Sequence, residues 1–188
     1  KLSDLVSKDC IIYNDTGANL CWSMMSFRVK HNQRLISAYG HSPMGYSISA
    51  GIGARYAERK KEIISIIGDG SFILNVQDLQ FLKHHKINLK VIVIDNQSLG
   101  NTRLGTKNAF KGRTFGNEKK YGYYPPDVKK ISKAFDIKYF SLVNDNEIKK
   151  KVSEFLKTKK TALLHVKVMP QIDVVDHTQK LLKSTYKF

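Results

Sequence analysis

The chain has 188 residues, of which 41% are hydrophobic and 10% aromatic. This length and composition are typical of a globular domain and exclude a disordered chain. The formal net charge is +16, but the lysines are spread along the chain in pairs such as Lys60–Lys61 and Lys129–Lys130, so we expect a field that attracts small anions and no nucleic-acid partner.

Strand and helix signals alternate along the chain. Apolar runs predict strands and helical spacing of apolar residues predicts helices, in the order short helix at the start, strand 10–15, helix 18–30, strand 34–39, helix 45–60, strand 62–69, helix 74–85, strand 88–96, helix 125–136, strand 138–143, helix 144–160 and strand 161–169. Between them, residues 97–126 carry several glycines and a proline pair. We expect this segment to be irregular and to act as a mobile lid.

No apolar run approaches the roughly 20 residues of a membrane span, and no signal peptide is visible, so we expect no membrane partner. Cys10 and Cys21 lack the spacing of a metal site or a redox pair. They are interpreted as reduced core thiols in a cytoplasmic protein. The chain starts at Lys1 without an initiator Met, which suggests a piece of a longer polypeptide.

Apolar strands, each followed by a helix, predict an α/β fold: a doubly wound, mainly parallel sheet with helices on both faces. Such sheets bind ligands beyond the carboxyl ends of their strands, where the strand order reverses. The segments to inspect are therefore "NDTG" (14–17), "SAYGHSPMG" (37–45), "GDGS" (68–71) and "DNQSLG" (95–100).

Asp69 stands between two glycines where a buried strand turns into a helix. Gly68 and Gly70 permit close approach of a ligand to the backbone. A carboxylate there would repel a phosphate directly, but it would attract a divalent cation that bridges to one. Asn96 follows the next strand along the chain and brings an amide oxygen to the same edge. Asp69 and Asn96 together predict a magnesium site; either alone is an ordinary turn residue.

Three segments resemble one family. "GDGSFILNVQDL" followed by "NLKVIVIDNQSLG" is similar to the cofactor motif of thiamine-diphosphate enzymes of the acetolactate synthase, pyruvate oxidase and 2-oxo acid decarboxylase superfamily. "IIYNDTGAN" and "YGHSPMGYSISAGIGARYA" resemble segments that precede this motif in the same enzymes. The resemblance covers about residues 1–100. It identifies the whole chain, residues 1–188, as a C-terminal thiamine-diphosphate-binding domain.

The resemblance implies a set of site residues. It assigns Mg²⁺ to the side chains of Asp69 and Asn96 and to the backbone carbonyl of Ser98. Met44 matches the apolar residue that bends the cofactor, and the Ser42 carbonyl would accept a hydrogen bond from the aminopyrimidine. The other cofactor contacts implied are Thr16, Gly17, Ala18, Asn19, Gly70, Ser71 and Gly100.

The resemblance also implies an activity. Such an enzyme decarboxylates a 2-oxo acid and, in an acetolactate synthase-like carboligase, transfers the resulting enamine to an acceptor. The family activates the cofactor with a glutamate from a pyrimidine-binding domain, usually of a partner subunit. No stretch here resembles that domain, so we expect the glutamate to lie outside this chain, the isolated chain to be inactive, and the enzyme to be a homodimer or homotetramer.

Other readings stay open. The chain has "GNTRLGT" (100–106) where branched-chain acetolactate synthases have a Gly-Met-Val-x-Gln-Trp pattern, which argues against valine–isoleucine biosynthesis specifically. A simple decarboxylase or an oxidoreductase of the same superfamily is the alternative. His41 and Asn101 are candidate substrate contacts in any of these enzymes. A non-catalytic binding module with the same fold and, from charge alone, a nucleic-acid-binding domain are readings from other classes.

Overall fold

The sheet has six strands, and every neighbouring pair is parallel. The computed structural model describes residues 1–169, in which the strand order is β2-β1-β3-β4-β6-β5. The strands are β1 (Ile11–Asn14), β2 (Arg34–Ile36), β3 (Ile63–Gly68), β4 (Lys90–Asp95), β5 (Lys138–Leu142) and β6 (Ala162–Lys167). The predicted fold class is confirmed, and the sheet is entirely parallel.

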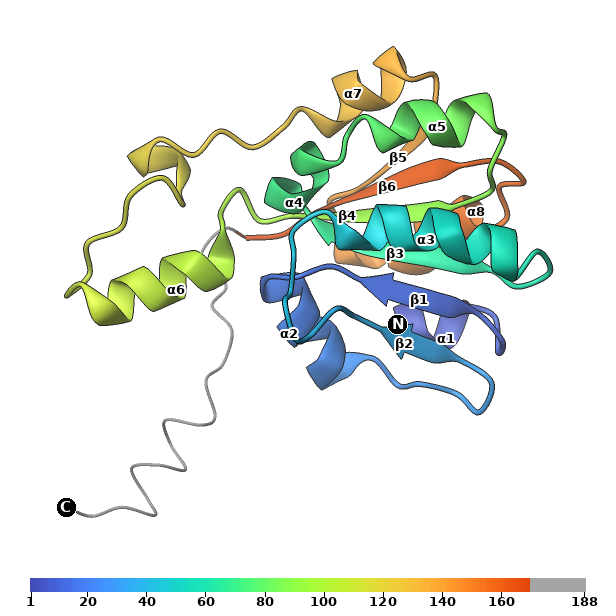
Figure 1. Ribbon diagram of the computed structural model, residues 1–188, viewed down its shortest axis with the longest axis horizontal. Helices are drawn as coiled ribbons and strands as arrows, with labels where there is room; N and C mark the ends of the chain where they lie inside the picture. Colours follow the sequence, from blue (N-terminus) through green and yellow to red (C-terminus); the bar gives the residue numbers. More distant parts are fainter. Residues whose placement is uncertain (170–188) are drawn as a thin grey trace.

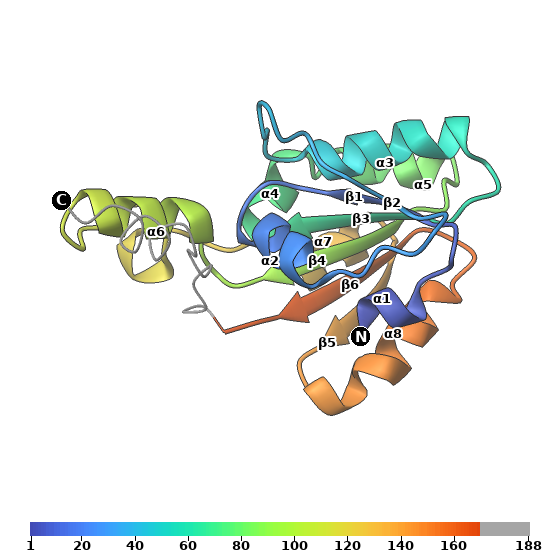
Figure 2. The ribbon, with the colours of Figure 1, turned by 90° about the horizontal axis from the view of Figure 1, so that it is seen from below.

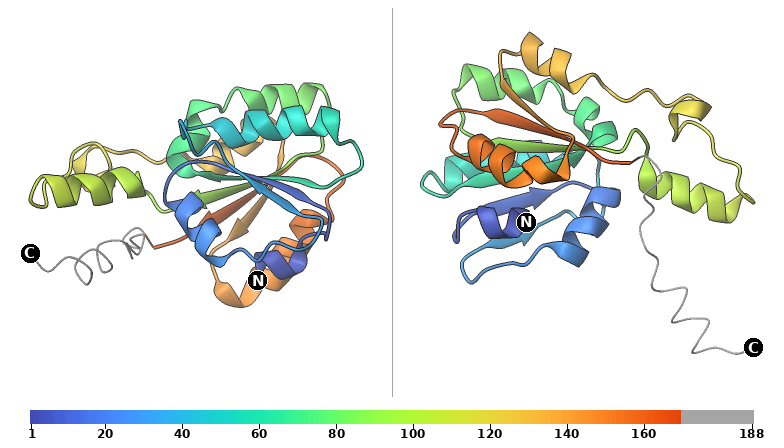
Figure 3. Two further views of the ribbon diagram at one scale, coloured as in Figure 1. Left: turned by 60° about the horizontal axis from the view of Figure 1, so that its bottom comes forward. Right: turned by 180° about the vertical axis from the view of Figure 1, so that it is seen from behind.

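Helices cover both faces of this sheet, which gives three layers (Figures 1 and 3). One face carries α3 (Tyr46–Ala57), α4 (Asp69–Leu74), α5 (Asp78–His84) and α7 (Val128–Ala134). The other carries α1 (Leu2–Leu5), α2 (Ala18–Ser26) and α8 (Ile148–Leu156). Strands covered on both faces must be apolar throughout, which is why these strands read as unbroken apolar runs.

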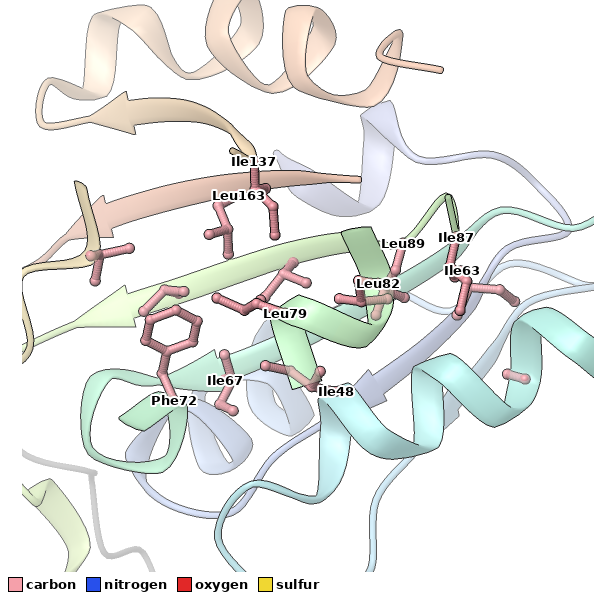
Figure 4. Close-up of a cluster of buried hydrophobic side chains, with 14 of the residues drawn as sticks. Ile48, Ile63, Ile67, Phe72, Leu79, Leu82, Ile87, Leu89, Ile137 and Leu163 are labelled. Carbon is pink, nitrogen blue, oxygen red and sulfur yellow. The ribbon is translucent and has the colours of Figure 1, made fainter. Parts of the chain in front are cut away.

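The sheet separates two clusters of buried side chains, and β3 contributes to both. Ile63 and Ile67 face the cluster beneath α3, α4 and α5 (Figure 4), whereas Ile64 and Ile66 face the cluster beneath α8. Alternate residues of a strand point to opposite faces. The central strand is therefore fixed from both sides, which holds its carboxyl end rigidly.

The chain reverses its direction across the sheet between β1 and β3. From β1 it crosses to β2 on one side, and from β3 it crosses to β4 on the other. The crossovers diverge at this point and leave a crevice at the carboxyl ends of the strands. Asn14, Gly68 and Asp95, the last residues of β1, β3 and β4, all lie at this edge.

The predicted helix over 74–85 is wrong in its bounds. Helix α4 already begins at Asp69, the chain leaves helical geometry at Asn75, and α5 begins at Asp78. The Asn75 side chain donates to the Gly45 carbonyl at 3.2 Å and to Ser49 Oγ at 2.8 Å. These tertiary hydrogen bonds tie Asn75 to the start of α3 and explain the break.

The sequence predicted that the segment 97–126 is irregular, and this is wrong for part of it. It contains α6 (Gly100–Ala109) and a short 3₁₀ turn, η1 (Lys119–Tyr121). Arg103 is the only buried residue of α6, so this helix lacks the apolar stripe from which helices are predicted. It extends beyond the carboxyl edge of the sheet (Figure 2). Its role as a mobile lid stays a prediction.

The domain bounds and the absence of a membrane span can be compared with the structure only over the described residues. The predicted domain reaches residue 188, but residues 170–188 lie outside the described part. Within residues 1–169, no helix has the length and apolar character needed to cross a membrane.

Candidate cofactor and metal site

A pocket of about 190 Å³ opens at the carboxyl ends of β1, β3 and β4. It lies at the reversal of strand order, where a doubly wound sheet binds its ligand. Four segments distant in sequence line it: residues 16–22, 42–44, 68–71 and 94–102. We describe its walls in that order.

The first wall is the turn from β1 into α2. Gly17 has a φ of +108°, a backbone conformation that disfavours any side chain. Asn19 donates from Nδ2 to Asn14 Oδ1 at 3.1 Å and to the Asp15 carbonyl at 3.0 Å, which closes the turn. The start of α2 therefore faces the pocket in a fixed orientation.

Asp15 joins this turn to the next wall. Its buried carboxylate accepts the backbone N–H groups of Thr16 and Gly45, each at 3.1 Å, and of Ser47 at 2.8 Å. Burial raises the pKa of Asp15, although the hydrogen bonds from Ser47, Ser71 and Gly45 oppose the shift. Asp15 thus connects the end of β1 to the start of α3 through hydrogen bonds.

The second wall is the loop before α3. Ser42 has a φ of +46° and Gly45 a φ of +89°, so the chain bends sharply on both sides of Met44. The Ser42 and Thr16 hydroxyl oxygens lie 2.6 Å apart. Met44 lines the pocket and remains 39% exposed. This loop presents an apolar side chain to the pocket between a left-handed serine and a left-handed glycine.

Asp69 is the buried acid of the third wall. Its side chain is 1% exposed, and Oδ2 accepts the Tyr123 hydroxyl at 2.9 Å. Burial raises the pKa of Asp69 to about 7; the hydrogen bond from Tyr123 opposes this shift, and the charge of Asp95 adds to it. The ionised form of this carboxylate has little contact with solvent and no basic side chain among these contacts, so a bound cation would stabilise it.

Asn96 and Ser98 bring two further polar groups to Asp69. One terminal atom of the Asn96 amide lies 3.1 Å from Asp69 Oδ1 and 2.7 Å from the Ser98 carbonyl oxygen, and with the amide nitrogen at that position Asn96 donates a hydrogen bond to both oxygens. Rotation of this amide by half a turn would direct its oxygen to the same place. A carboxylate, an amide oxygen and a backbone carbonyl are hard ligands of the kind that Mg²⁺ prefers. In the described residues no group of three or more His, Cys, Asp and Glu side chains forms a metal site.

Neighbouring side chains occupy the space that a side chain at position 70, next to Asp69, would need. A Cβ atom there would lie 2.4 Å from Leu99 Cδ2 and 3.2 Å from Tyr123 Oη. The glycine therefore allows the loop after β4 and the segment bearing Tyr123 to pack against the start of α4.

A protein-family model, the thiamine pyrophosphate enzyme C-terminal TPP-binding domain, matches residues 15–166. The chain belongs to this family. The match spans all four segments that line the pocket. The resemblance read from the sequence is thereby confirmed.

Several curated relatives are acetolactate synthases. The chain is 28% identical over 168 residues to the isozyme 2 large subunit of Escherichia coli, a match of 89% of this chain and 30% of that protein. It is 28% identical over 178 residues to the chloroplastic acetolactate synthase 1 of Zea mays, covering 93% and 28%. A probable large subunit from Methanocaldococcus jannaschii is 29% identical over 163 residues, covering 87% and 27%. The chain thus spans less than a third of the length of these relatives.

The pocket of this thiamine pyrophosphate domain brings together nearly all residues singled out in the sequence. The metal candidates Asp69, Asn96 and Ser98 line it, as does the substrate candidate Asn101. The cofactor candidates in its lining are Thr16, Gly17, Ala18, Asn19, Ser42, Met44, Gly70, Ser71 and Gly100. His41 is exposed and is not among the lining residues.

Sequence reasoning missed three neighbours of the pocket. Trp22 lines it, one helical turn after Ala18, and this spacing was a usable signal. Leu99 lines it from the loop after β4. Tyr123 reaches Asp69 across 54 positions of sequence, and no local pattern announces such a contact.

Proposed function

We propose that this chain supplies the thiamine-diphosphate and Mg²⁺ half of the active site of an enzyme that decarboxylates a 2-oxo acid and joins the remaining fragment to an acceptor. The observation that carries the proposal is the convergence of Asp69, Asn96 and Ser98 on one point of the pocket. When bound, thiamine diphosphate supplies a carbon nucleophile and an electron sink for the loss of CO₂.

The metal would be held by the Asp69 carboxylate, the Asn96 amide oxygen and the Ser98 carbonyl. Mg²⁺ takes near-octahedral oxygen coordination, so these groups leave positions for phosphate oxygens and water. The turn from β1 and the start of α4 would surround the diphosphate. Those contacts are Thr16, Gly17, Ala18, Asn19, Gly70, Ser71 and Gly100.

The loop before α3 would orient the rings of the cofactor. Met44 offers an apolar support in the pocket, and the Ser42 carbonyl is a hydrogen-bond acceptor for the aminopyrimidine. The loop is tied down by the contact of the Ser42 hydroxyl with Thr16 and by the hydrogen bond from Gly45 N–H to Asp15. A rigid support of this kind favours catalysis by holding reacting groups in position.

The second half of the site would come from another domain. We propose that an activating glutamate of a pyrimidine-binding domain, from a partner subunit of a homodimer or homotetramer, completes it. The 39% exposure of Met44 supports a covering surface at this place. The isolated chain should therefore release no CO₂ from pyruvate, and measurable decarboxylation by it would overturn this part of the proposal.

The acceptor step is the finer part of the proposal. Similarity to acetolactate synthases supports a carboligase. Asn101 and Gly105 stand where branched-chain synthases carry Met and Trp. This departure from the branched-chain pattern makes a simple decarboxylase the second candidate. Incubation of the intact enzyme with pyruvate decides between them: a carboligase forms acetolactate, whereas a simple decarboxylase forms acetaldehyde.

Cofactor binding can be measured with the chain's own fluorescence. Trp22 is the only tryptophan and lines the pocket, so thiamine diphosphate with Mg²⁺ should quench its emission. Asp69→Ala should abolish the Mg²⁺-dependent part. Asp9→Ala removes the same charge from the exposed segment before β1 and should leave it unchanged. Equal quenching in both variants would refute the metal assignment.

A further inference from the structure

Three neighbouring strands carry a line of polar contacts, half-buried at Tyr139 and buried at His165 and Asp95, that leads to the metal-site loop. His165 on β6 lies with Nε2 2.8 Å from Asp95 Oδ2 on β4, and with Nδ1 2.9 Å from Tyr139 Oη on β5. The His165 and Asp95 side chains are each 7% exposed. The register pairs His165 with Val93, two residues before Asp95, so both polar side chains lie on one face of the sheet.

The directions of these hydrogen bonds follow from their chemistry. A carboxylate accepts hydrogen bonds and donates none, so the proton between His165 and Asp95 lies on Nε2. When the imidazole is neutral it accepts at Nδ1, and the Tyr139 hydroxyl donates to it. The imidazole is therefore held from both sides, and it holds the Asp95 carboxylate in one orientation.

The other oxygen of that carboxylate supports the loop. Asp95 Oδ1 accepts the backbone N–H of Gln97 at 3.0 Å. Gln97 has a φ of +54°, a left-handed conformation that is strained for any residue with a side chain. It stands between Asn96 and Ser98, the two metal candidates of this loop. A short acidic side chain bonded two residues ahead stabilises such a turn.

The far end of the loop is held separately. Ser98 Oγ donates to the Asn117 carbonyl at 2.8 Å, and Leu99 N–H donates to the same oxygen at 2.9 Å. The near end depends on Asp95. Without it, the backbone at Gln97 is free to relax, and the Asn96 side chain and Ser98 carbonyl need no longer meet at Asp69.

We propose that Tyr139, His165 and Asp95 form a relay of hydrogen bonds, buried at His165 and Asp95 and half-buried at Tyr139, whose task is to position the metal-binding loop, with His165 as its central positioning residue. This inference rests on the proposed metal site. It goes beyond that site because none of the three side chains is a proposed ligand. Partners behind the ligands set their orientation and, when removed, typically weaken metal binding 10- to 100-fold.

The test measures binding of Mn²⁺ alone, as a paramagnetic substitute for Mg²⁺, by the loss of its free electron-spin-resonance signal. His165→Leu should weaken Mn²⁺ binding about 10-fold or more. His165→Gln keeps an amide N–H that can reach Asp95, and it should restore most of the affinity. Tyr139→Phe, which frees Nδ1 only, should have a smaller effect in the same direction.

A control separates positioning from general stability. Val93→Ala removes apolar volume from the buried strand partner of His165 and should lower the free energy of unfolding without changing Mn²⁺ affinity. If His165→Leu and Tyr139→Phe both bind Mn²⁺ as tightly as the unchanged chain, the relay is refuted. Tyr139→Phe keeps this comparison available if His165→Leu does not fold.

The same titration distinguishes failure of the relay from failure of the site. If Asp69→Ala abolishes Mn²⁺ binding but the His165 variants do not affect it, the metal site stands and the relay falls. If Asp69→Ala binds Mn²⁺ like the unchanged chain, the proposed metal site itself is wrong and the relay falls with it.

Discussion

Replacement of Asp69 by Asn should stabilise the metal-free protein while it destroys metal binding. The Asp69 side chain is 1% exposed, and burial raises its pKa from 3.8 to about 7. Folding therefore opposes ionisation of this carboxyl. Asn has the same shape without the charge, and its oxygen can still accept the Tyr123 hydroxyl. The variant thus keeps the local hydrogen bond and removes the buried charge.

The magnitude follows from the pKa shift. A difference of about 3 pKa units corresponds to about 4 kcal/mol at pH values above 7, at 1.36 kcal/mol per unit. Because the folded pKa is raised, the contribution of Asp69 to stability is lost as the pH rises through about 7. Asp69→Asn does not titrate, so its advantage over the unchanged chain should grow by about 3 kcal/mol between pH 5 and pH 8.

The assay is urea unfolding followed by circular dichroism, in EDTA, at pH 5, 6, 7 and 8. Addition of Mg²⁺ and thiamine diphosphate should then stabilise the unchanged chain at pH 8, because a ligand that binds only the folded state raises its stability. The same addition should leave Asp69→Asn unaffected. A variant that is less stable than the unchanged chain at pH 8, or whose advantage does not change with pH, would contradict this account of Asp69.

Two further predictions concern stability away from the pocket. Gly51→Ala places a Cβ 2.6 Å from Ser65 Oγ and 2.8 Å from Leu89 Cδ1, so it should lower the free energy of unfolding in urea by about 1–3 kcal/mol. Gly53→Ala in the same helix meets nothing within 4 Å and should raise that free energy by up to about 1 kcal/mol. Equal effects of the two substitutions would show that the close contact at Gly51 has no energetic weight. Burial lowers the pKa of Lys90 from 10.5 to about 8, so the contribution of Lys90 to stability is lost as the pH falls through about 8. Between pH 8 and pH 10.5 the free energy of unfolding of the unchanged chain should rise by about 3 kcal/mol relative to that of Lys90→Met. Parallel pH profiles of the two proteins would refute this.

The local sequence predicted the elements whose burial leaves a periodic pattern. The strands that became β3 and β4 were apparent because each is covered on both faces and must be apolar at every position. The segment that became α6 was not predicted as a helix because Arg103 is its only buried residue. A helix without an apolar face leaves no periodic signal. The break at Asn75 depends on hydrogen bonds to Gly45 and Ser49, which local propensity cannot reveal.

The residues of the candidate site likewise fall into those that the sequence predicted and those that it did not. Asp69 and Asn96 were found because each polar residue ends an apolar strand, and parallel strands end at one edge. Tyr123 donates to Asp69 from 54 residues away, and His165 contacts Asp95 from 70 residues away. These contacts depend on the strand order and on the path of the chain after β4, so no spacing in the sequence encodes them.

The sequence by itself therefore determined the fold class and the residues at the ends of the strands, because alternation of apolar strands and helices leaves few arrangements of a parallel sheet. The family came from the resemblance of particular segments to a known cofactor motif. The tertiary structure alone decided how those ends meet. It set the strand order that places His165 behind Asp95, the burial that raises the pKa of Asp69 and the approach of Asn96 and Ser98 to one point. The physical reason is that strand identity follows from short-range pattern, whereas burial and proximity arise only when distant segments pack.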